Sequence, residues 1–277
     1  MSCNVVVAAP QGGVGRTTIV AQLALRISAL GKRCLAMDFD PQNSLGLRLG
    51  EEPIAWVQRS TAAGRGNRIP LSAVGLVHPQ LSQSVLAEQA RVRGGRVSHV
   101  AFGVHSCAER WQMEADMLVE FGGFRARVAE LTPPKCDVVL IDTPAGQNIW
   151  AEAALGLADV VLVPLLARAS TAALLPGYEQ YLQEVAPDLP ADRTFYVISQ
   201  WDPTRALSHD VLELLRSVRA PQMVAHPIFY DEALEESFAR GHATSLDDAF
   251  QVAADFDMLA KFLVEATSVH ERRAASA

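Results

Sequence analysis

The feature that most constrains the fold is a glycine-rich run near the start of the chain. Residues 11–18 read Gln-Gly-Gly-Val-Gly-Arg-Thr-Thr, after the β-branched residues 5–7 and before an apolar-periodic stretch at 19–30. Glycines let consecutive backbone N–H groups turn inward around an anion, and the following helix adds its unpaired N–H groups and the positive end of its dipole. The run predicts a phosphate cradle between a buried strand and a helix. A glycine turn that binds nothing is the alternative.

Every residue of this run is a candidate for nucleotide binding: Gln11, Gly12, Gly13, Val14, Gly15, Arg16, Thr17 and Thr18. In the pattern G-x-x-x-x-G-K-[ST], the hydroxyl at the position of Thr17 completes a Mg²⁺ coordination shell, so Thr17 is also a predicted metal ligand. Arg16 stands where that pattern has lysine. Arginine keeps the positive charge on a wider, planar fork, which suits phosphate binding without a point charge between the β and γ oxygens. Arg16 is also a catalytic candidate.

Acids end two further apolar stretches. Residues 33–40 read as a buried strand that finishes in Asp38 and Asp40, and residues 136–142 as a strand that ends in Asp142 before a Pro/Gly turn. Acids at the carboxyl ends of parallel strands lie at the rim where such sheets bind ligands. The second stretch has the Walker B pattern, whose buried acid holds a magnesium-bound water. Asp142 is therefore a predicted metal ligand, and the alternative is an acid that caps the next helix.

These segments resemble the ParA/MinD family of ATPases. The run at 11–18 is similar to that family's deviant Walker A loop K-G-G-x-G-K-[ST]-T, residues 38–42 to its D-x-D-P-Q segment, and residues 142–146 to its D-T-P-x-G segment. The resemblance implies an α/β P-loop NTPase of the SIMIBI class, with a doubly wound, mostly parallel sheet flanked by helices in a single domain over 1–277. It also implies ATP and Mg²⁺ as cofactors and a homodimer formed around the nucleotide.

The same resemblance implies roles for two more residues. Asp40 corresponds to the acid that positions or activates the attacking water, which makes it a catalytic candidate. A turn at Asp40–Pro41, with Asn43 or Ser44 capping the next helix, is the structural alternative and is compatible with that role. Gln11 stands where the family has a lysine that reaches the partner's nucleotide. Because Gln11 carries no charge, we expect ATP binding with slow or no hydrolysis.

Beyond these motifs the chain alternates strand and helix. Expected strands are 97–103, 159–165, 194–199 and 224–228, and expected helices are 108–131 (with Met113, Met117, Leu118, Phe121 and Phe124 on its apolar side), 170–185, 208–218, 231–240 and 249–266. Between 57 and 96 the periodicity fades. Arginines dominate there (Arg59, Arg65, Arg68, Arg91, Arg93 and Arg96) over the single acid Glu88. This indicates an irregular basic insertion, either solvated or in contact with an acidic partner. Residues 267–277 read as a polar tail.

Charge and composition narrow the partner classes. A net charge of −7 disfavours non-specific binding to nucleic acid, and no sequence-specific nucleic-acid contact is expected. The most apolar stretch, 160–167, is too short to span a membrane, and the first residues carry no basic leader. The four cysteines lie far apart, as in reduced cytosolic proteins. We expect a cytoplasmic protein without direct membrane insertion.

The second half is similar to the BcsQ group, the accessory ATPases of bacterial cellulose-synthase operons. The similarity rests on residues 196–203, 207–211 with 214–216, 231–237 and 253–260. It implies a nucleotide-dependent dimer that supports cellulose or other exopolysaccharide secretion, recruited by operon proteins to the inner membrane or cell pole. Ser199 stands where the wider family has an asparagine that reads adenine, so it is the candidate for base contact. A partition or placement ATPase that cycles on DNA or membrane is the alternative function.

Overall fold

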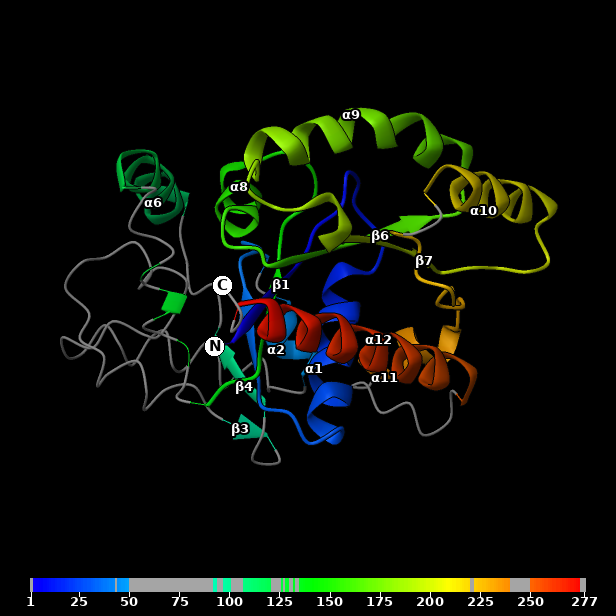
Figure 1. The fold of residues 1–277 in the computed structure, drawn as a ribbon, viewed down its shortest axis with the longest axis horizontal. Coiled ribbons are helices and arrows are strands. Elements are labelled where there is room, and N and C mark those ends of the chain that lie inside the picture. Colours follow the sequence, from blue (N-terminus) through cyan, green and yellow to red (C-terminus); the bar gives the residue numbers. More distant parts are fainter. Residues whose placement is uncertain are drawn as a thin grey trace.

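The sheet has the predicted doubly wound, mostly parallel order. The computed structural model describes residues 2–42, 44–49, 92–93, 97–100, 107–120, 126, 128–129, 132, 135–219, 222–239 and 250–274. Within them, seven strands form one sheet in the order β3-β4-β2-β5-β1-β6-β7, in which only β3 and β4 pair antiparallel (Figure 1). The strands are β1 (Cys3–Val7), β2 (Cys34–Asp38), β3 (Val92–Arg93), β4 (Val97–Val100), β5 (Val138–Asp142), β6 (Val160–Leu166) and β7 (Thr194–Ser199).

The strand order brings the predicted motifs to one rim. β5 lies between β2 and β1, and β6 continues the sheet on the other side of β1. Asp142, the last residue of β5, pairs with Val7 of β1 on one side and with Asp38 of β2 on the other. Strands β1, β2 and β5 therefore end at the same edge of the sheet, and the glycine-rich run follows the end of β1. A doubly wound sheet binds its ligands at such a carboxyl edge, where the strand order reverses.

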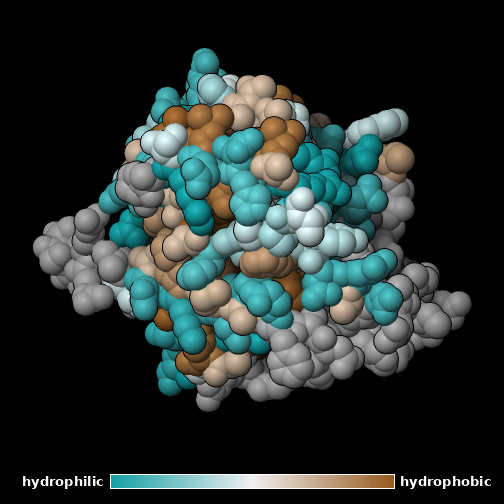
Figure 2. Space-filling model, turned by 90° about the vertical axis from the view of Figure 1, so that its right-hand side faces the viewer, coloured by the Kyte–Doolittle hydropathy of each residue, from teal (hydrophilic) through white to brown (hydrophobic). Residues whose placement is uncertain are grey.

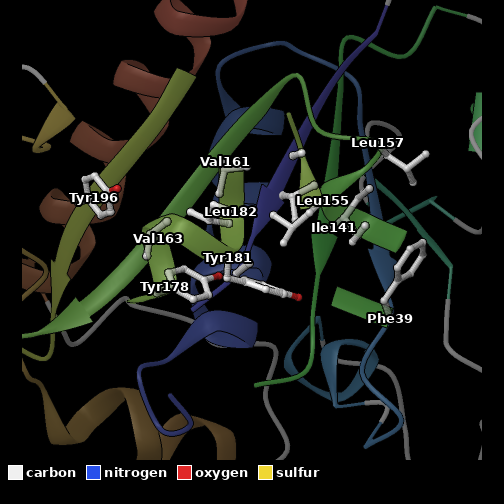
Figure 3. Packing of buried hydrophobic residues seen from close by; sticks show 14 of the residues in the cluster. Phe39, Ile141, Leu155, Leu157, Val161, Val163, Tyr178, Tyr181, Leu182 and Tyr196 are labelled. Atoms are coloured by element: carbon white, nitrogen blue, oxygen red, sulfur yellow. The ribbon is translucent and has the colours of Figure 1, made fainter. Parts of the chain in front are cut away.

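Helices cover both faces of the sheet. One face carries α1 (Arg16–Ala29), α2 (Leu45–Arg48), α11 (Glu232–Ala239) and α12 (Phe250–Ala274), and the other carries α6 (Cys107–Glu120), α8 (Ile149–Leu155), α9 (Ala169–Val185) and α10 (Ala206–Arg219) (Figure 1). Val5 and Val6 show the reason, because successive strand residues point into opposite hydrophobic clusters. Figure 3 shows the cluster that contains Val6, on the face covered by α9, in which Tyr178 and Leu182 of α9 lie beside Val163 of β6.

The predicted strand at 224–228 is wrong. The residues on either side of it, Met223 and Phe229, form isolated bridges to Tyr196 and Trp201. Within the segment, Val224 and Ile228 each donate one backbone N–H to β7, to the carbonyls of Tyr196 and Ile198 at 2.8 Å, which is too few bonds for a strand. Pro227 lies in the middle of the segment and has no N–H to donate to a ladder. At the opposite edge of the sheet lies a strand that was not predicted, the antiparallel β3, which falls near the end of the predicted insertion. The rest of the insertion at 57–96 lies outside the described residues.

Two helices differ from their predicted faces or limits. In α6, Met117 is buried, but Leu118 is 75% exposed, because neighbouring helix residues point about 100° apart. Phe121 and Phe124 lie outside the described residues, as do residues 101–103 of the strand predicted at 97–103. Helix α12 continues to Ala274, through most of the stretch that reads as a polar tail. On the face shown in Figure 2, hydrophobic side chains lie in small patches separated by hydrophilic ones.

Candidate functional site

The glycine-rich loop leads from β1 into α1 and is shaped by two left-handed residues. Gly13 has a φ of 73° and Gly15 a φ of 80°, a region that side-chain-bearing residues rarely adopt. Gly15 is also the N-cap residue of α1, and no side chain caps this helix. The first N–H groups of α1 thus have no capping side chain and point toward the loop, as an anion site requires.

Arg16, the first residue of α1, joins two loops. Its Nε donates to the carbonyl oxygen of Thr143 and its Nη1 to the carbonyl oxygen of Gln11, both at 2.9 Å. The residue is 9% exposed. Within the part of the chain that the structure describes, Nη2 makes no hydrogen bond. The guanidinium therefore ties the glycine-rich loop to the chain that follows β5 and keeps one nitrogen for another ligand.

The side chain of Gln11 is held within its own chain. Its Nε2 donates to Oγ1 of Thr171, which is fully buried near the start of α9, at 3.2 Å. The residue for which the sequence resemblance implies a lysine that reaches across a dimer is thus a glutamine that contacts α9. This contact adds a polar link between the glycine-rich loop and the helical layer above it.

The carboxyl end of β7 supports the glycine-rich loop from below. Ser199 Oγ donates to the carbonyl oxygen of Val14 at 2.8 Å, and Gln200 Nε2 donates to that of Gly13 at 2.6 Å. Gln200 takes a left-handed conformation, with a φ of 52°, to reach it. The hydroxyl of Ser199 is thus engaged with the loop backbone, and its predicted contact with a base stays a prediction.

Asp142 lies in the environment that a metal ligand requires. Its side chain is fully buried, and neither carboxylate oxygen has a hydrogen-bond partner among the described residues. Burial raises the pKa of Asp142 to about 7, against the opposing effects of the Thr17 hydroxyl and the Arg16 guanidinium. The predicted alternative, a helix cap, is wrong, because Asn148 accepts the first N–H groups of α8.

Asp38 organises the loop after β2. Its two carboxylate oxygens accept the N–H groups of Asp40 and Leu45, at 2.9 and 3.0 Å. Asp38 therefore starts α2, while Ser44 makes no capping bond and Asn43 lies outside the described residues. Burial and the neighbouring Asp142 raise the pKa of Asp38.

Asp40 lies in the predicted turn. Its Oδ1 accepts the N–H of Gln42 at 2.9 Å, a local bond that leaves Oδ2 without a recorded partner within the described residues. Asp40 is close enough to Asp142 to raise the pKa of that buried acid. The structure thus brings this catalytic candidate to the same site as Thr17 and Asp142, and its chemical role stays a prediction.

The donor set fits a magnesium-bound phosphate ligand. Mg²⁺ prefers oxygen ligands in near-octahedral geometry and is usually held by few protein oxygens together with phosphates and water. Both carboxylate oxygens of Asp142 are without a hydrogen-bond partner among the described residues, and the Thr17 hydroxyl lies beside them. The uncapped start of α1 and the two left-handed glycines supply N–H groups for phosphate oxygens. The groups predicted to hold phosphate and metal therefore lie at one rim, and their binding of nucleotide and Mg²⁺ stays a prediction.

Sequence reasoning missed several residues that build this site. Thr143 was noted only as part of a motif, yet its carbonyl accepts Arg16 and its Oγ1 donates to the Val7 carbonyl at 2.9 Å. Gln200, which the sequence singles out only within 196–203, and Thr171 had no local signal for a contact with the loop, because each meets it from an element far along the chain. A buried acid at the end of β2 was visible, but its role in starting α2 depends on the fold of residues 38–45.

Residues 5–244 match the family described as the CobQ/CobB/MinD/ParA nucleotide binding domain. The chain belongs to this family. The match spans the glycine-rich loop, both acid-ending strands and β7, so the family's domain includes every residue of the site described above. A curated relative, the virulence plasmid ParA family protein pGP5-D of Chlamydia muridarum, is 21% identical over 231 residues, which is 83% of this chain and 80% of the relative.

Solved structures of this CobQ/CobB/MinD/ParA fold superimpose over almost the whole chain. Cobyrinic acid a,c-diamide synthase from Mycobacterium smegmatis, solved with an ATP analogue and magnesium, has a TM-score of 0.67 at 22% identity and 95% coverage of both chains. McdA(D38A) of Cyanothece, in complex with ATP, has a TM-score of 0.70 at 17% identity and 96% coverage of both. MinD in the MinC:MinD complex of Aquifex aeolicus gives 0.69 at 17% identity, covering 95% of this chain and 96% of that one.

No helix in the described part of the chain is both long and apolar enough to cross a membrane.

Proposed function

We propose that this protein binds ATP with Mg²⁺ and acts as a nucleotide-dependent homodimeric switch of the ParA/MinD type. The observation that carries the proposal is the fully buried carboxylate of Asp142, without a hydrogen-bond partner among the described residues and next to the Thr17 hydroxyl. An unpaired buried carboxylate is costly unless a cation neutralises it. Family membership and the nucleotides and magnesium in the solved structures of the same fold support the same assignment.

The residues of the site would contact different parts of the bound nucleotide. The backbone N–H groups of residues 12–18 and the start of α1 would hold the phosphates, and Thr17 and Asp142 would hold Mg²⁺, which neutralises phosphate charge. Arg16 would meet phosphate through Nη2, because Nε and Nη1 are occupied by backbone carbonyls. Asp40 would orient the attacking water, and Ser199 would lie below the loop near the base site.

Isothermal titration of the purified protein with ATP and Mg²⁺ tests the proposal. We expect wild-type protein to bind, and Gly15→Val to lose binding, because valine at a φ of 80° is strained and would distort the cradle. The matched control is Gly177→Val in α9, where an added Cβ meets no atom within 4 Å. Absence of binding by wild-type protein, or undiminished binding by Gly15→Val, would refute the proposal.

We further infer a cellular role in cellulose or related exopolysaccharide secretion, with the switch recruited to the synthase by other operon proteins. The support is the BcsQ-like sequence at 196–203 and in the C-terminal third. Pull-down from ATP-replete cells should recover synthase components. The competing role is partition or placement of DNA or other cargo, which the similarity to a plasmid ParA-family protein favours. Recovery of chromosomal DNA with a centromere-binding protein, and of no synthase component, would decide for partition.

A further inference from the structure

Two neighbouring pairs of residues face each other between the glycine-rich loop and the end of β5. Arg16 and Thr17 begin α1, and Asp142 and Thr143 stand at and just after the end of β5. Arg16 and Thr143 are joined by the 2.9 Å bond from Nε to the carbonyl oxygen. Thr17 and Asp142, each one residue away, are the pair that fits Mg²⁺. The hydrogen bond therefore spans the same gap that a shared metal ion would span.

Both ends of this contact are fixed. Thr143 is fully buried and its Oγ1 donates to the Val7 carbonyl at 2.9 Å, which anchors it to β1. On the other side, Nη1 of the same guanidinium holds the Gln11 carbonyl at the beginning of the loop. A planar guanidinium keeps the two donors at a fixed separation, whereas a lysine ammonium is one point on a flexible stem. Arginine and lysine are therefore not equivalent at this position.

We propose that Arg16 is a positioning residue that sets the spacing between the loop and the end of β5, and with it the geometry that Thr17 and Asp142 offer to Mg²⁺. The proposal rests on the proposed function, since it assumes a magnesium-bound nucleotide. Mg²⁺ demands near-octahedral coordination at short distances, so a small change in this spacing lowers its affinity. The loss of a residue that orients metal ligands from outside the coordination shell typically costs about 10- to 100-fold in metal affinity.

The test compares Arg16→Lys with wild type for ADP affinity, once with Mg²⁺ and once with EDTA. We expect the gain in ADP affinity that Mg²⁺ provides to fall at least about tenfold in Arg16→Lys. The affinity in EDTA should fall by a clearly smaller factor, because lysine keeps the positive charge that meets phosphate. Arg26→Lys, in the last turn of the same helix, is the matched control and should alter neither affinity; Arg26 pairs with Asp257 at 2.9 Å.

A second measurement uses hydrogen exchange of the protein without metal or nucleotide. The Gly146 amide donates to the Ala9 carbonyl at 3.2 Å, between the two loops that Arg16 joins. We expect this amide to exchange faster in Arg16→Lys while the melting temperature changes little. Equal weakening of ADP binding with Mg²⁺ and with EDTA would overturn the proposal, since Arg16 would then only hold phosphate. No change in either affinity would overturn it too.

The exchange measurement also separates the two proposals. If wild-type protein bound no nucleotide under either condition, the proposed function would be rejected. Exchange at Gly146 would still decide whether Arg16 sets the spacing between the loops, and an unchanged rate in Arg16→Lys would reject that role.

Discussion

The side chain of Gln11 donates a hydrogen bond to Thr171 of its own chain, at the position for which the sequence resemblance implies a lysine that reaches the partner's nucleotide. Positive charge at the γ phosphate is commonly worth about 10³ or more in rate when an arginine or lysine is well placed. We predict that wild-type protein hydrolyses ATP slowly and that Gln11→Lys raises turnover at least about tenfold. Phosphate release measures both.

Thr171→Val is the control for this substitution. It removes the acceptor of the Gln11 side chain without adding charge, so turnover should not rise. Brisk hydrolysis by wild-type protein without any partner would show that Gln11 is no defect.

The buried Asp142 makes the stability of the metal-free protein depend on pH. Its pKa is raised from an ordinary 3.8 to about 7, chiefly by burial. Between these values the folded protein holds a proton that the unfolded chain has lost, so the free energy of unfolding falls as pH rises from about 4 to about 7. We predict that Asp142→Asn flattens this fall and stabilises the metal-free protein at pH 8 by about 1 to 3 kcal/mol.

Urea denaturation in EDTA across this pH range measures the effect. Asp188→Asn, at an exposed aspartate, is the control and should keep the wild-type pH dependence. With Mg²⁺ and ADP the order should reverse, because wild-type protein gains binding free energy that Asp142→Asn cannot. A pH profile of Asp142→Asn identical to that of wild type would contradict the assignment of this carboxylate.

At the scale of elements, one polar network joins α9, α10 and β7. Glu179 of α9 accepts two hydrogen bonds from the guanidinium of Arg219, at the end of α10, and a third from Tyr196 of β7 at 2.9 Å. These three side chains border a cavity of about 340 Å³, which lies at the end of the sheet away from the glycine-rich loop. The polar groups of this ion pair are satisfied by one another, which favours a structural role for the network over a ligand site.

We predict that Glu179→Ala lowers the free energy of unfolding by about 1 to 3 kcal/mol, because it leaves Arg219 and Tyr196 without their shared acceptor. Urea denaturation measures it. Arg205→Ala is the control: Arg205 is 67% exposed and pairs with Asp202 at 3.1 Å within one loop, so its loss should cost less than about 1 kcal/mol. Equal costs for the two variants would show that the network adds nothing to the packing of α10.

At the scale of the whole molecule, two hydrophobic clusters share one sheet. Phe256 of α12 belongs to the cluster under α1, and Leu155 of α8 to the cluster on the opposite face; both are 1% exposed. We predict that Phe256→Ala lowers the free energy of unfolding by about 3 to 5 kcal/mol and Leu155→Ala by about 2 to 5 kcal/mol. Leu207→Ala, at a residue 60% exposed, should change it by less than about 0.5 kcal/mol.

Calorimetry should show one transition for wild-type protein and for each of these variants. Each cluster is built on alternate residues of the same strands, so neither face can unfold and leave the other intact. Two separated transitions, one moved only by Phe256→Ala and the other only by Leu155→Ala, would contradict a single domain.

Local sequence patterns predicted most of the strands and the chemical groups at the carboxyl edge of the sheet. The predicted strands at 5–7, 33–40, 136–142, 159–165 and 194–199 are present as β1, β2, β5, β6 and β7, because each is a run of mostly apolar residues that suits a strand of a parallel sheet. The loop at 11–18 was also recognisable, because its glycines, the start of its helix and Thr17 are neighbours in sequence. Asp142 was identifiable because a single acid ends an otherwise apolar strand.

Only the tertiary structure decided which groups meet at this rim. Gln200 and Ser199 support the loop from 187 and 185 residues away, as Thr171 holds Gln11 from 160 and Thr143 holds Arg16 from 127; bonds of this kind leave no periodic or local pattern. The same holds for the failed strand at 224–228, where an edge position and Pro227 outweighed an apolar run. Sequence by itself determined that phosphate and metal groups would lie at one edge, because parallel strands end together there. The packing of distant elements determined that the side chains of Arg16 and Gln11 each hydrogen-bond within their own chain.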